Sequence, residues 1–158
     1  MNRRKVFGLS AITALGLALL SSNAFAQQAA DMEGVKAASK AFYTALAVID
    51  DGAAMDKVWA HTPYTYVGPR SKSIVVGWDA QKKYWEETNK VFSERNVSLS
   101  DQHVHVNGNL AWELGQETGQ MKMKDGTAPK PDYIATNVYE KIDGRWLMVS
   151  HHVQPKPQ

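Results

Sequence analysis

The chain has 158 residues, of which 44% are hydrophobic and 22% are charged, and it contains no cysteine. This size and balance suit one globular domain with its own core, and they exclude a disordered or fibrous chain. The lack of cysteine excludes a disulfide scaffold, a thiol nucleophile and a cysteine-ligated metal site.

Residues 1–26 have the three-part pattern of a secretory signal. Arg3, Arg4 and Lys5 precede an uncharged stretch, 6–20, and Ala24-Phe25-Ala26 places small residues at the two positions that a signal peptidase reads. The uncharged stretch is shorter than the roughly 20 residues that a membrane-spanning helix needs. We therefore expect cleavage after Ala26 and export to the periplasm or the medium. The paired arginines leave the general and the twin-arginine routes open.

Removal of this segment changes the charge of the protein. The whole chain carries a formal charge of +2, and the signal contains three basic and no acidic residues. The remainder has 15 basic against 16 acidic side chains, a net charge near −1. We therefore expect no nucleic-acid partner and, after cleavage, no membrane partner.

Helical periodicity begins soon after the signal. Asp50-Asp51-Gly52 ends the first predicted helix. A short second helix, with Met55, Val58 and Trp59 on one face, stops before Pro63. The apolar stripe of the first helix consists of Val35, Ala38, Phe42, Ala45, Leu46 and Ile49.

Two short strands and a third helix follow. We predict strands at 64–67, closed by Gly68-Pro69, and at 73–76, and a helix that Asp79 caps after Trp78. The buried face predicted for this helix consists of Tyr84, Trp85, Thr88, Val91 and Phe92.

The remainder of the chain predicts consecutive antiparallel strands. Asn107-Gly108, Asp125-Gly126 and Asp143-Gly144 are turn signals between them. The predicted strands are 97–106, 110–123, 133–142 and 145–153. Helices grouped before such a meander must cover one of its faces, so we expect an α+β fold. Residues 27–154 form a single domain in this interpretation, and 155–158 form a tail.

Several local strings resemble the SnoaL-like and ketosteroid-isomerase-like branch of the nuclear-transport-factor-2-like superfamily. The most specific are Ala135-Thr136-Asn137-Val138-Tyr139, the segment 143–149 (DGRWLMV) and His151-His152. Weaker matches are 58–60, 66–69 and 76–78, and the resemblance covers 33–154. It implies a cone-shaped fold in which a strongly curved antiparallel sheet packs around the N-terminal helices. It also implies an apolar pocket open at one end and a homodimer that packs sheet against sheet.

The resemblance also tests one mechanism. Ketosteroid isomerases have an aspartate base before the position of Pro69, but this chain has Gly68 there, which cannot titrate. Tyr43 matches the family's oxyanion tyrosine, whereas Thr136 or Asn137 stands where the family has an acid. We therefore expect no steroid isomerisation by that mechanism.

Other acid–base chemistry remains open, with a histidine as the proton carrier. Strand periodicity places Trp146, Met148, Ser150 and His152 on one face. The resemblance favours His152, with Tyr43 and Asn137 as hydrogen-bonding partners of the ligand. A register shift of one residue would exchange His152 for His151.

The expected function is the binding of a small apolar or aromatic molecule, with cofactor-free isomerase, dehydratase or hydrolase chemistry, and whether the chain is an enzyme stays undecided. A non-catalytic ligand-binding or assembly module is the alternative. His103 and His105 share a strand face near Glu113 or Glu117, but we expect no metal there. The aromatic residues predicted to line the pocket are Trp59, Tyr66, Trp78 and Trp112.

Overall fold

Helices and two short strands come first in the chain, and four long strands follow. A computed structural model describes residues 11–67 and 73–157, with side chains from residue 24 onward. The elements are α1 (Ala11–Leu46), α2 (Ala53–Asp56), β1 (Tyr66–Val67), β2 (Val75–Val76), α3 (Trp78–Val91), β3 (Phe92–Asn107), β4 (Leu110–Met123), β5 (Asp132–Ile142) and β6 (Arg145–Pro155).

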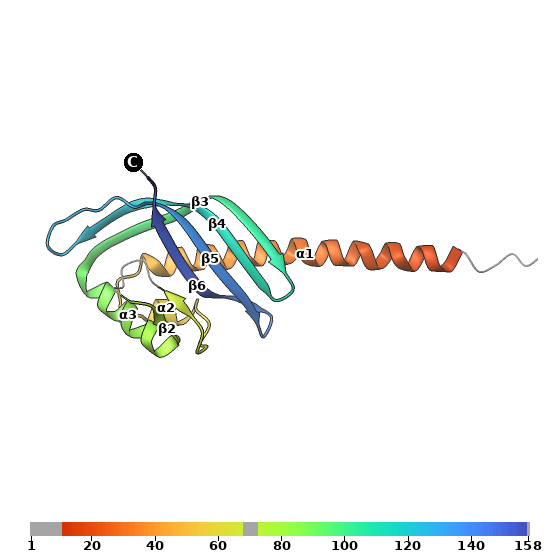
Figure 1. Cartoon of the computed structure of the whole chain (residues 1–158), viewed down its shortest axis with the longest axis horizontal. Coiled ribbons are helices and arrows are strands. Elements are labelled where there is room, and N and C mark those ends of the chain that lie inside the picture. Colours follow the sequence, from red (N-terminus) through yellow and green to blue (C-terminus); the bar gives the residue numbers. More distant parts are fainter. Residues whose placement is uncertain (1–10, 68–72, 158) are drawn as a thin grey trace, which may run out of the picture.

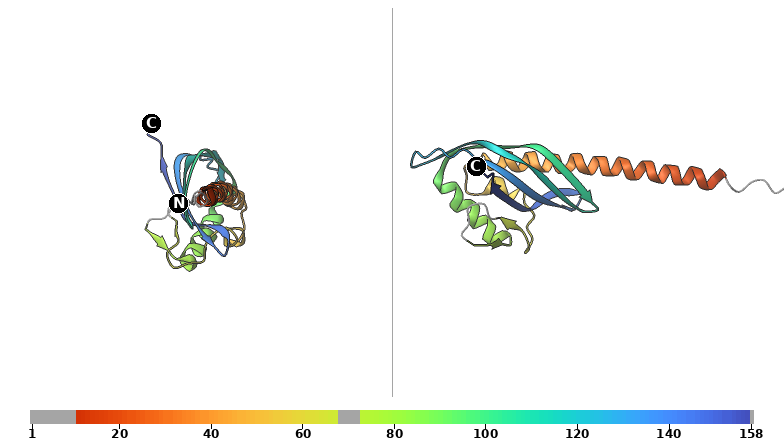
Figure 2. Two further views of the ribbon diagram at one scale, coloured as in Figure 1. Left: turned by 90° about the vertical axis from the view of Figure 1, so that its right-hand side faces the viewer. Right: turned by 45° about the horizontal axis from the view of Figure 1, so that its top comes forward.

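The strands form one sheet in the order β2-β1-β6-β5-β4-β3 (Figure 1). Strands β3 to β6 are antiparallel neighbours, as the meander prediction requires, and β1 pairs with β6 in parallel. Seen along α1, the sheet curves around one side of that helix (Figure 2). The α+β class and the curved sheet predicted from the sequence are confirmed.

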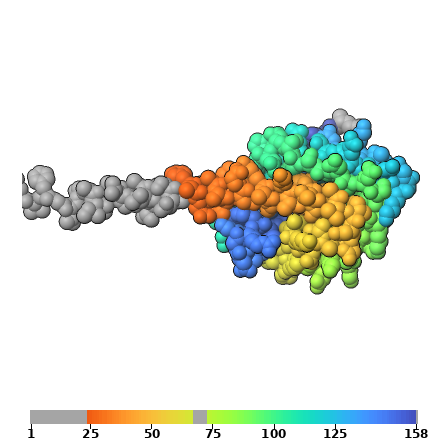
Figure 3. Space-filling view, turned by 180° about the vertical axis from the view of Figure 1, so that it is seen from behind, coloured from red at the N-terminus to blue at the C-terminus, as the bar shows by residue number. Residues whose placement is uncertain are grey.

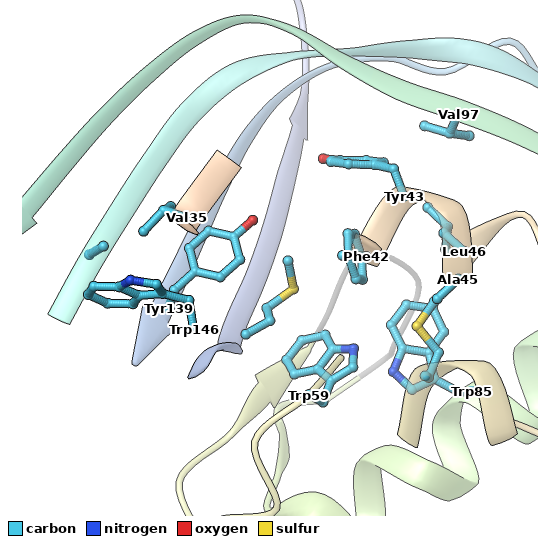
Figure 4. Packing of buried hydrophobic residues seen from close by; sticks show 13 residues of the cluster. Val35, Phe42, Tyr43, Ala45, Leu46, Trp59, Trp85, Val97, Tyr139 and Trp146 are labelled. Atoms are coloured by element: carbon cyan, nitrogen blue, oxygen red, sulfur yellow. The ribbon is translucent and has the colours of Figure 1, made fainter. Parts of the chain in front are cut away.

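The C-terminal half of α1 supplies the centre of the core. Val35, Phe42 and Leu46 are buried, as the helical stripe predicts, whereas Ile49 lies beyond the end of the helix. Phe42 packs against Trp59 and Trp85 beneath the sheet, whereas Val35 lies near Tyr139 and Trp146 (Figure 4). The earlier part of α1 extends away from the domain (Figures 1 and 3). No helix within the described residues is long and apolar enough to cross a membrane.

Helix α3 buries only part of the face predicted for it. Gln81, Trp85 and Asn89 are its buried residues, at a spacing of four, whereas Val91 is 40% exposed. Asn89 is polar but buried because its amide nitrogen donates to the carbonyl oxygen of Asp50 at 3.0 Å. Phe92 is buried as expected, but it begins β3 instead of ending the helix.

The hairpin turns follow the glycine signals. Asp143 and Gly144 both have positive φ, at 49° and 78°, which is typical of a type I′ turn. At the first hairpin the turn lies one residue later than predicted: Asn107 pairs with Leu110, and Gly108-Asn109 forms the loop.

The strand pairings contain three register shifts, of which one on β6 and one in the middle of β3 set which residues face inward at the site. On β6, Ser150 pairs with Val138 and Met148 pairs with Tyr139, so Val149 is an extra residue. Because a bulge adds one residue, it reverses the alternation of side chains beyond it. Trp146 and Met148 face inward before the bulge, and His151 faces inward after it.

The second bulge lies on β3. Ser100 pairs with Gln116 and His103 pairs with Leu114, so the extra residue lies between them, where Asp101 has a positive φ of 51°. Beyond this point Gln102, and not Asp101, shares the inner face, where its amide reaches Glu113.

Candidate functional site

Polar side chains of the inner sheet face meet beside α1. Strand β4 alternates, so that Glu113 and Glu117 point inward together with Ala111 and Gly115. We call the cluster that they form the buried polar network; its members are Tyr43, Glu113, Glu117, Asn137, Tyr139 and His151, all of which are buried.

Asn137 lies at the centre of the buried polar network. Its amide nitrogen donates to Oε2 of Glu113 at 3.0 Å and contacts the Tyr43 hydroxyl at 3.5 Å. Its carbonyl oxygen lies 2.8 Å from Nδ1 of His151. Asn137 thus contacts Glu113 directly and is connected to Glu117 through Tyr43 and His151. These contacts fix the orientation of its amide.

Glu113 forms the closed side of the network. Oε2 accepts hydrogen bonds from Asn137 and from the Tyr139 hydroxyl, both at 3.0 Å, and Oε1 accepts one from Gln102 at 2.7 Å. Burial raises the pKa of Tyr139 well above its ordinary value, and the nearby Glu113 raises it further, so the phenol stays a donor. Glu113 therefore has its oxygens occupied by partners within the protein.

Glu117 forms the open side. The Tyr43 hydroxyl donates to Oε2 at 3.0 Å, and Nε2 of His151 lies 3.8 Å from the same oxygen. Oε1 has no hydrogen-bond partner among the described residues. Burial raises the pKa of Glu117 to about 7, against the opposing effect of the Tyr43 hydrogen bond. A carboxyl group with this pKa can both accept and return a proton near neutral pH.

His151 is neutral in this environment. Burial, with a smaller contribution from the neighbouring His152, lowers the pKa of its imidazole to about 3. Burial also raises the pKa of Tyr43, with a further contribution from Glu117. At neutral pH the open side of the network therefore presents a phenol donor, an imidazole and a carboxyl group near its midpoint.

Glu117 and His151 lie on the wall of a cavity of about 160 Å³, which we call the Glu117 cavity. It lies between the end of α1, helix α3 and the inner face of the sheet. Trp85 and Arg95 are buried in its wall, whereas Tyr133 and Pro155 are more exposed. Its lining residues are Leu46, Tyr84, Trp85, Thr88, Phe92, Arg95, Val97, Glu117, Met121, Tyr133, His151, Val153 and Pro155.

A larger hollow, of about 730 Å³, is a groove between α1 and β3. It includes Tyr43 and Gln102, but the solvent-exposed Glu33 and Lys40 also line it. Because neither Glu117 nor His151 lines this groove, the smaller cavity is the better candidate for chemistry.

The structure brings together two of the three predicted catalytic residues. Tyr43 and Asn137 are 3.5 Å apart in the buried polar network. His152 lies outside it, exposed on the other face of β6, and His151 occupies the inward position. The bulge at Val149 is the reason, because it reverses the alternation on which the choice of His152 rests. The prediction for Gly68 lies outside the described residues.

The four aromatic residues predicted to line a pocket do not line the Glu117 cavity. Trp59 is buried in the core against Phe42, with ring centroids 6.0 Å apart. Trp78 stacks on His61 at 4.4 Å, and Tyr66 belongs to the short strand β1. Trp112 is 39% exposed on the outer face of the sheet. The aromatic residues that line the cavity are Tyr84, Trp85, Phe92 and Tyr133.

Glu113 and Glu117 were predicted only as neighbours of His103 and His105. Those histidines are exposed on the opposite face of the sheet, where His105 stacks on Trp112 at 4.1 Å. The alternation of β4 was the available signal: it places both glutamates on the face of Ala111.

A model of the SnoaL-like domain family matches residues 35–154. Among curated proteins, none matches this chain. A Streptomyces avermitilis protein named as a candidate dehydratase of the NTF2-like family has 22% identity and a TM-score of 0.71, over 82% of this chain and 99% of that one.

Two further solved structures share the fold. A candidate aromatic ring hydroxylase from Novosphingobium aromaticivorans has 14% identity and a TM-score of 0.73, over 81% of this chain and 90% of that one. The association domain of C. elegans CaMKII has 17% identity and a TM-score of 0.62, over 81% of this chain and 98% of that one. The family match spans the sheet, α3 and the part of α1 that carries Tyr43, and with it the whole buried polar network. The chain shares its fold with solved NTF2-like proteins, and it belongs to the SnoaL-like domain family.

Proposed function

We propose that this protein binds a small, mainly apolar or aromatic molecule in the Glu117 cavity and moves a proton on it without a cofactor. The single observation that carries the proposal is Glu117 itself: a buried carboxyl group on the wall of an apolar cavity, with its pKa raised to about 7. Such a group is suited to general acid–base catalysis at neutral pH. The structural neighbour named as a candidate dehydratase supports this class of reaction.

In this proposal Glu117 replaces His152 as the proton carrier. Oε1 of Glu117, which has no partner among the described residues, takes the proton from the ligand. Tyr43 holds the other oxygen through its 3.0 Å hydrogen bond. Asn137 positions the imidazole of His151 beside the carboxyl group.

The test is solvent-deuterium incorporation into one-ring carbonyl compounds. Phenylacetone and phenylpyruvate, one neutral and one anionic, are incubated with the protein in D₂O, and loss of the benzylic proton signal is followed by NMR. We expect protein-dependent exchange of at least one compound, reduced by roughly 10²-fold or more in Glu117→Gln. Glu94→Gln, the same change at an exposed site on β3, is the matched control and should exchange like the wild type.

One observation favours the alternative of a non-catalytic binding module. The Tyr43 hydroxyl and the Asn137 amide are already paired inside the network, so neither is free to hold a ligand. Binding of the probes with no exchange above the protein-free rate would support this alternative and overturn the catalytic proposal. Exchange that is as fast in Glu117→Gln as in the wild type would remove Glu117 from the mechanism.

We further propose that the protein forms a homodimer through the outer face of its sheet. Leu110, Trp112, Leu114 and Ile134 are each 39–47% exposed there, on β4 and β5. An exposed apolar patch of this kind is typical of an interface. Leu114→Lys should yield a monomer in light scattering, while Val48→Lys, at an exposed apolar residue after α1 and not on the sheet, should keep the wild-type mass. A wild-type protein with a monomeric mass would refute the dimer.

Export also stays a proposal, with cleavage after Ala26. Within the described contacts, the first side chain to bind the sheet is Asp31, which pairs with Lys141 at 2.6 Å. Removal of residues 1–26 would therefore leave the packing of the domain intact. Mass spectrometry of the protein from a periplasmic or medium fraction should give an N-terminus at Gln27. An intact Met1 in that fraction would contradict it.

A further inference from the structure

A buried arginine in the Glu117 cavity has no counter-ion among residues 11–67 and 73–157. Arg95 of β3 is 5% exposed, and it forms no ion pair with any described residue. Its Nε donates to the carbonyl oxygen of Leu46, and Nη2 donates to Oδ1 of Asn89 at 2.7 Å. The third nitrogen, Nη1, is buried and has no hydrogen-bond partner in the part of the chain that the structure describes.

An uncompensated buried charge of this kind is costly. Burial lowers the pKa of Arg95 to about 10, so the guanidinium stays positive at neutral pH. Removing a guanidinium from water without a carboxylate or another oxyanion destabilises a protein. A ligand that brings its own negative charge would offset this cost.

The ionisable groups around the cavity do not supply that charge. Asp50 and Tyr84 act electrostatically on Arg95 and raise its pKa, but neither reverses the lowering by burial. Below its pKa of about 7, Glu117 is neutral, as is His151 above its pKa of about 3. The cavity wall therefore carries a net positive charge on the acid side of neutrality.

The sheet register separates Arg95 from Glu117. Glu117 pairs with Leu99, and Arg95 lies four residues back along β3. Four residues of strand correspond to about 13 Å, which explains why the two groups form no ion pair. Both side chains line the same cavity, so they mark two ends of one binding space.

We propose that Arg95 binds the carboxylate of a small monoanionic ligand whose apolar body, about the size of one aromatic ring, extends towards Glu117. This inference rests on the proposed function, since it assigns a ligand class to the same cavity. An apolar cavity of about 150 Å³ holds a benzene ring, and the volume here is about 160 Å³. The walls that would contact the ring include Trp85, Phe92 and Met121.

The chemistry of the wall favours a carboxylate over a phosphate ester. One guanidinium with one unpartnered nitrogen can balance a single negative charge. A phosphate ester carries a charge of about −1.5 to −2 at neutral pH, and Glu117 adds further negative charge as it ionises. A monoanion is therefore the better match.

The experiment compares phenylacetate with phenylacetamide, which has nearly the same shape and no charge. Binding to the purified wild-type protein is measured by calorimetry near pH 6.5, and we expect phenylacetate to bind at least about tenfold more tightly. Arg95→Met should abolish this preference, and Arg95→Lys should retain part of it. Arg145→Met, at an exposed arginine of β6, is the matched control and should keep the full preference.

The outcomes separate this inference from the proposed function. If phenylacetamide binds the wild type as tightly as phenylacetate, the anion site is refuted while the cavity remains a ligand site. If neither compound binds, both proposals fail for one-ring ligands. Tighter binding of phenyl phosphate than of phenylacetate would overturn the assignment to carboxylates. The comparison of acid and amide on the wild type needs no variant, so it holds even if Arg95→Met does not fold.

Discussion

Nδ1 of His151 lies 2.8 Å from the side-chain oxygen of Asn137. The amide nitrogen of Asn137 donates to Glu113 at 3.0 Å, so its oxygen is the atom that faces the ring. A carbonyl oxygen only accepts hydrogen bonds, and therefore Nδ1 carries the ring proton. The unprotonated Nε2 then lies towards Oε2 of Glu117, at 3.8 Å.

This geometry predicts the tautomer of His151. Nitrogen NMR of labelled protein should show Nδ1 protonated and Nε2 unprotonated, without titration between about pH 8 and about pH 5, because burial lowers the pKa to about 3. Replacing Asn137 by Leu removes the acceptor and should produce a mixture of tautomers. A single Nε2-protonated form in the wild type would contradict the assignment.

The raised pKa of Glu117 predicts how stability depends on pH. In the unfolded chain the carboxyl group ionises near pH 4.5, and in the folded protein near pH 7. Between these values the folded state binds more protons than the unfolded state, so this group makes stability fall as pH rises, by about 3 kcal/mol in all. The free energy of unfolding of the wild type and of Glu117→Gln can be measured in urea. The value for the wild type, relative to that for Glu117→Gln, should fall as the pH rises from about 4.5 to about 7.

The opposite slope is expected from His151, whose lowered pKa makes stability fall as pH drops below about 6.5. In Glu117→Gln the opposite contribution of Glu117 is absent, so the loss of stability at low pH that His151 causes should be seen in full. A stability difference between wild type and Glu117→Gln that stays constant from about pH 4.5 to about pH 7 would show that Glu117 has an ordinary pKa.

Glu113 should be a stabilising residue of the fold. Its oxygens accept from Tyr139, Asn137 and Gln102. Glu113→Gln turns one acceptor into a donor that faces other donors, and it should cost roughly 1–3 kcal/mol of unfolding free energy. The exposed Glu94→Gln should change stability by less than about 0.5 kcal/mol. Equal effects of the two substitutions in urea unfolding would refute the role of Glu113.

Gly34 should tolerate no side chain, although it lies inside a helix. Gly→Ala in an open helix stabilises by up to about 1 kcal/mol. Here the added Cβ would lie 2.7 Å from Cδ1 of Trp146, so Gly34→Ala should destabilise by roughly 1–3 kcal/mol. Thermal unfolding of Gly34→Ala in wild-type and Trp146→Leu backgrounds tests this, because the smaller residue should remove most of the cost. A stabilising Gly34→Ala would contradict the close contact.

The long strands and the helical stripe could be predicted because their signals are local and repeated. Alternation and Asp-Gly turns define β3 to β6, and the spacing of Val35, Phe42 and Leu46 defines the buried side of α1. The burial of Asn89 could not be predicted, since it depends on partners distant in sequence, Asp50 among them.

The site was predicted less well, for two physical reasons. A bulge depends on how neighbouring strands fit together, and the residues around Val149 give no local signal for one. Simple alternation therefore favours His152, whereas His151 faces inward in the structure. Acids are rarely buried, which argues against an inward Glu117 although the alternation of β4 places it there. Tyr43 and Asn137 were found because the family resemblance, and not periodicity, identified them.

The arginine of the cavity has a second consequence. Leu46 is the last residue of α1, and its carbonyl oxygen accepts from Nε of Arg95, so the guanidinium caps the negative end of the helix dipole. Asn89 joins the same cation to the end of α3. An anion bound at Nη1 would thus contact the same guanidinium that binds the ends of α1 and α3. Occupancy of the cavity would then be linked to fraying of those helix ends, and slower amide exchange at Ala47 and Val48 would report it.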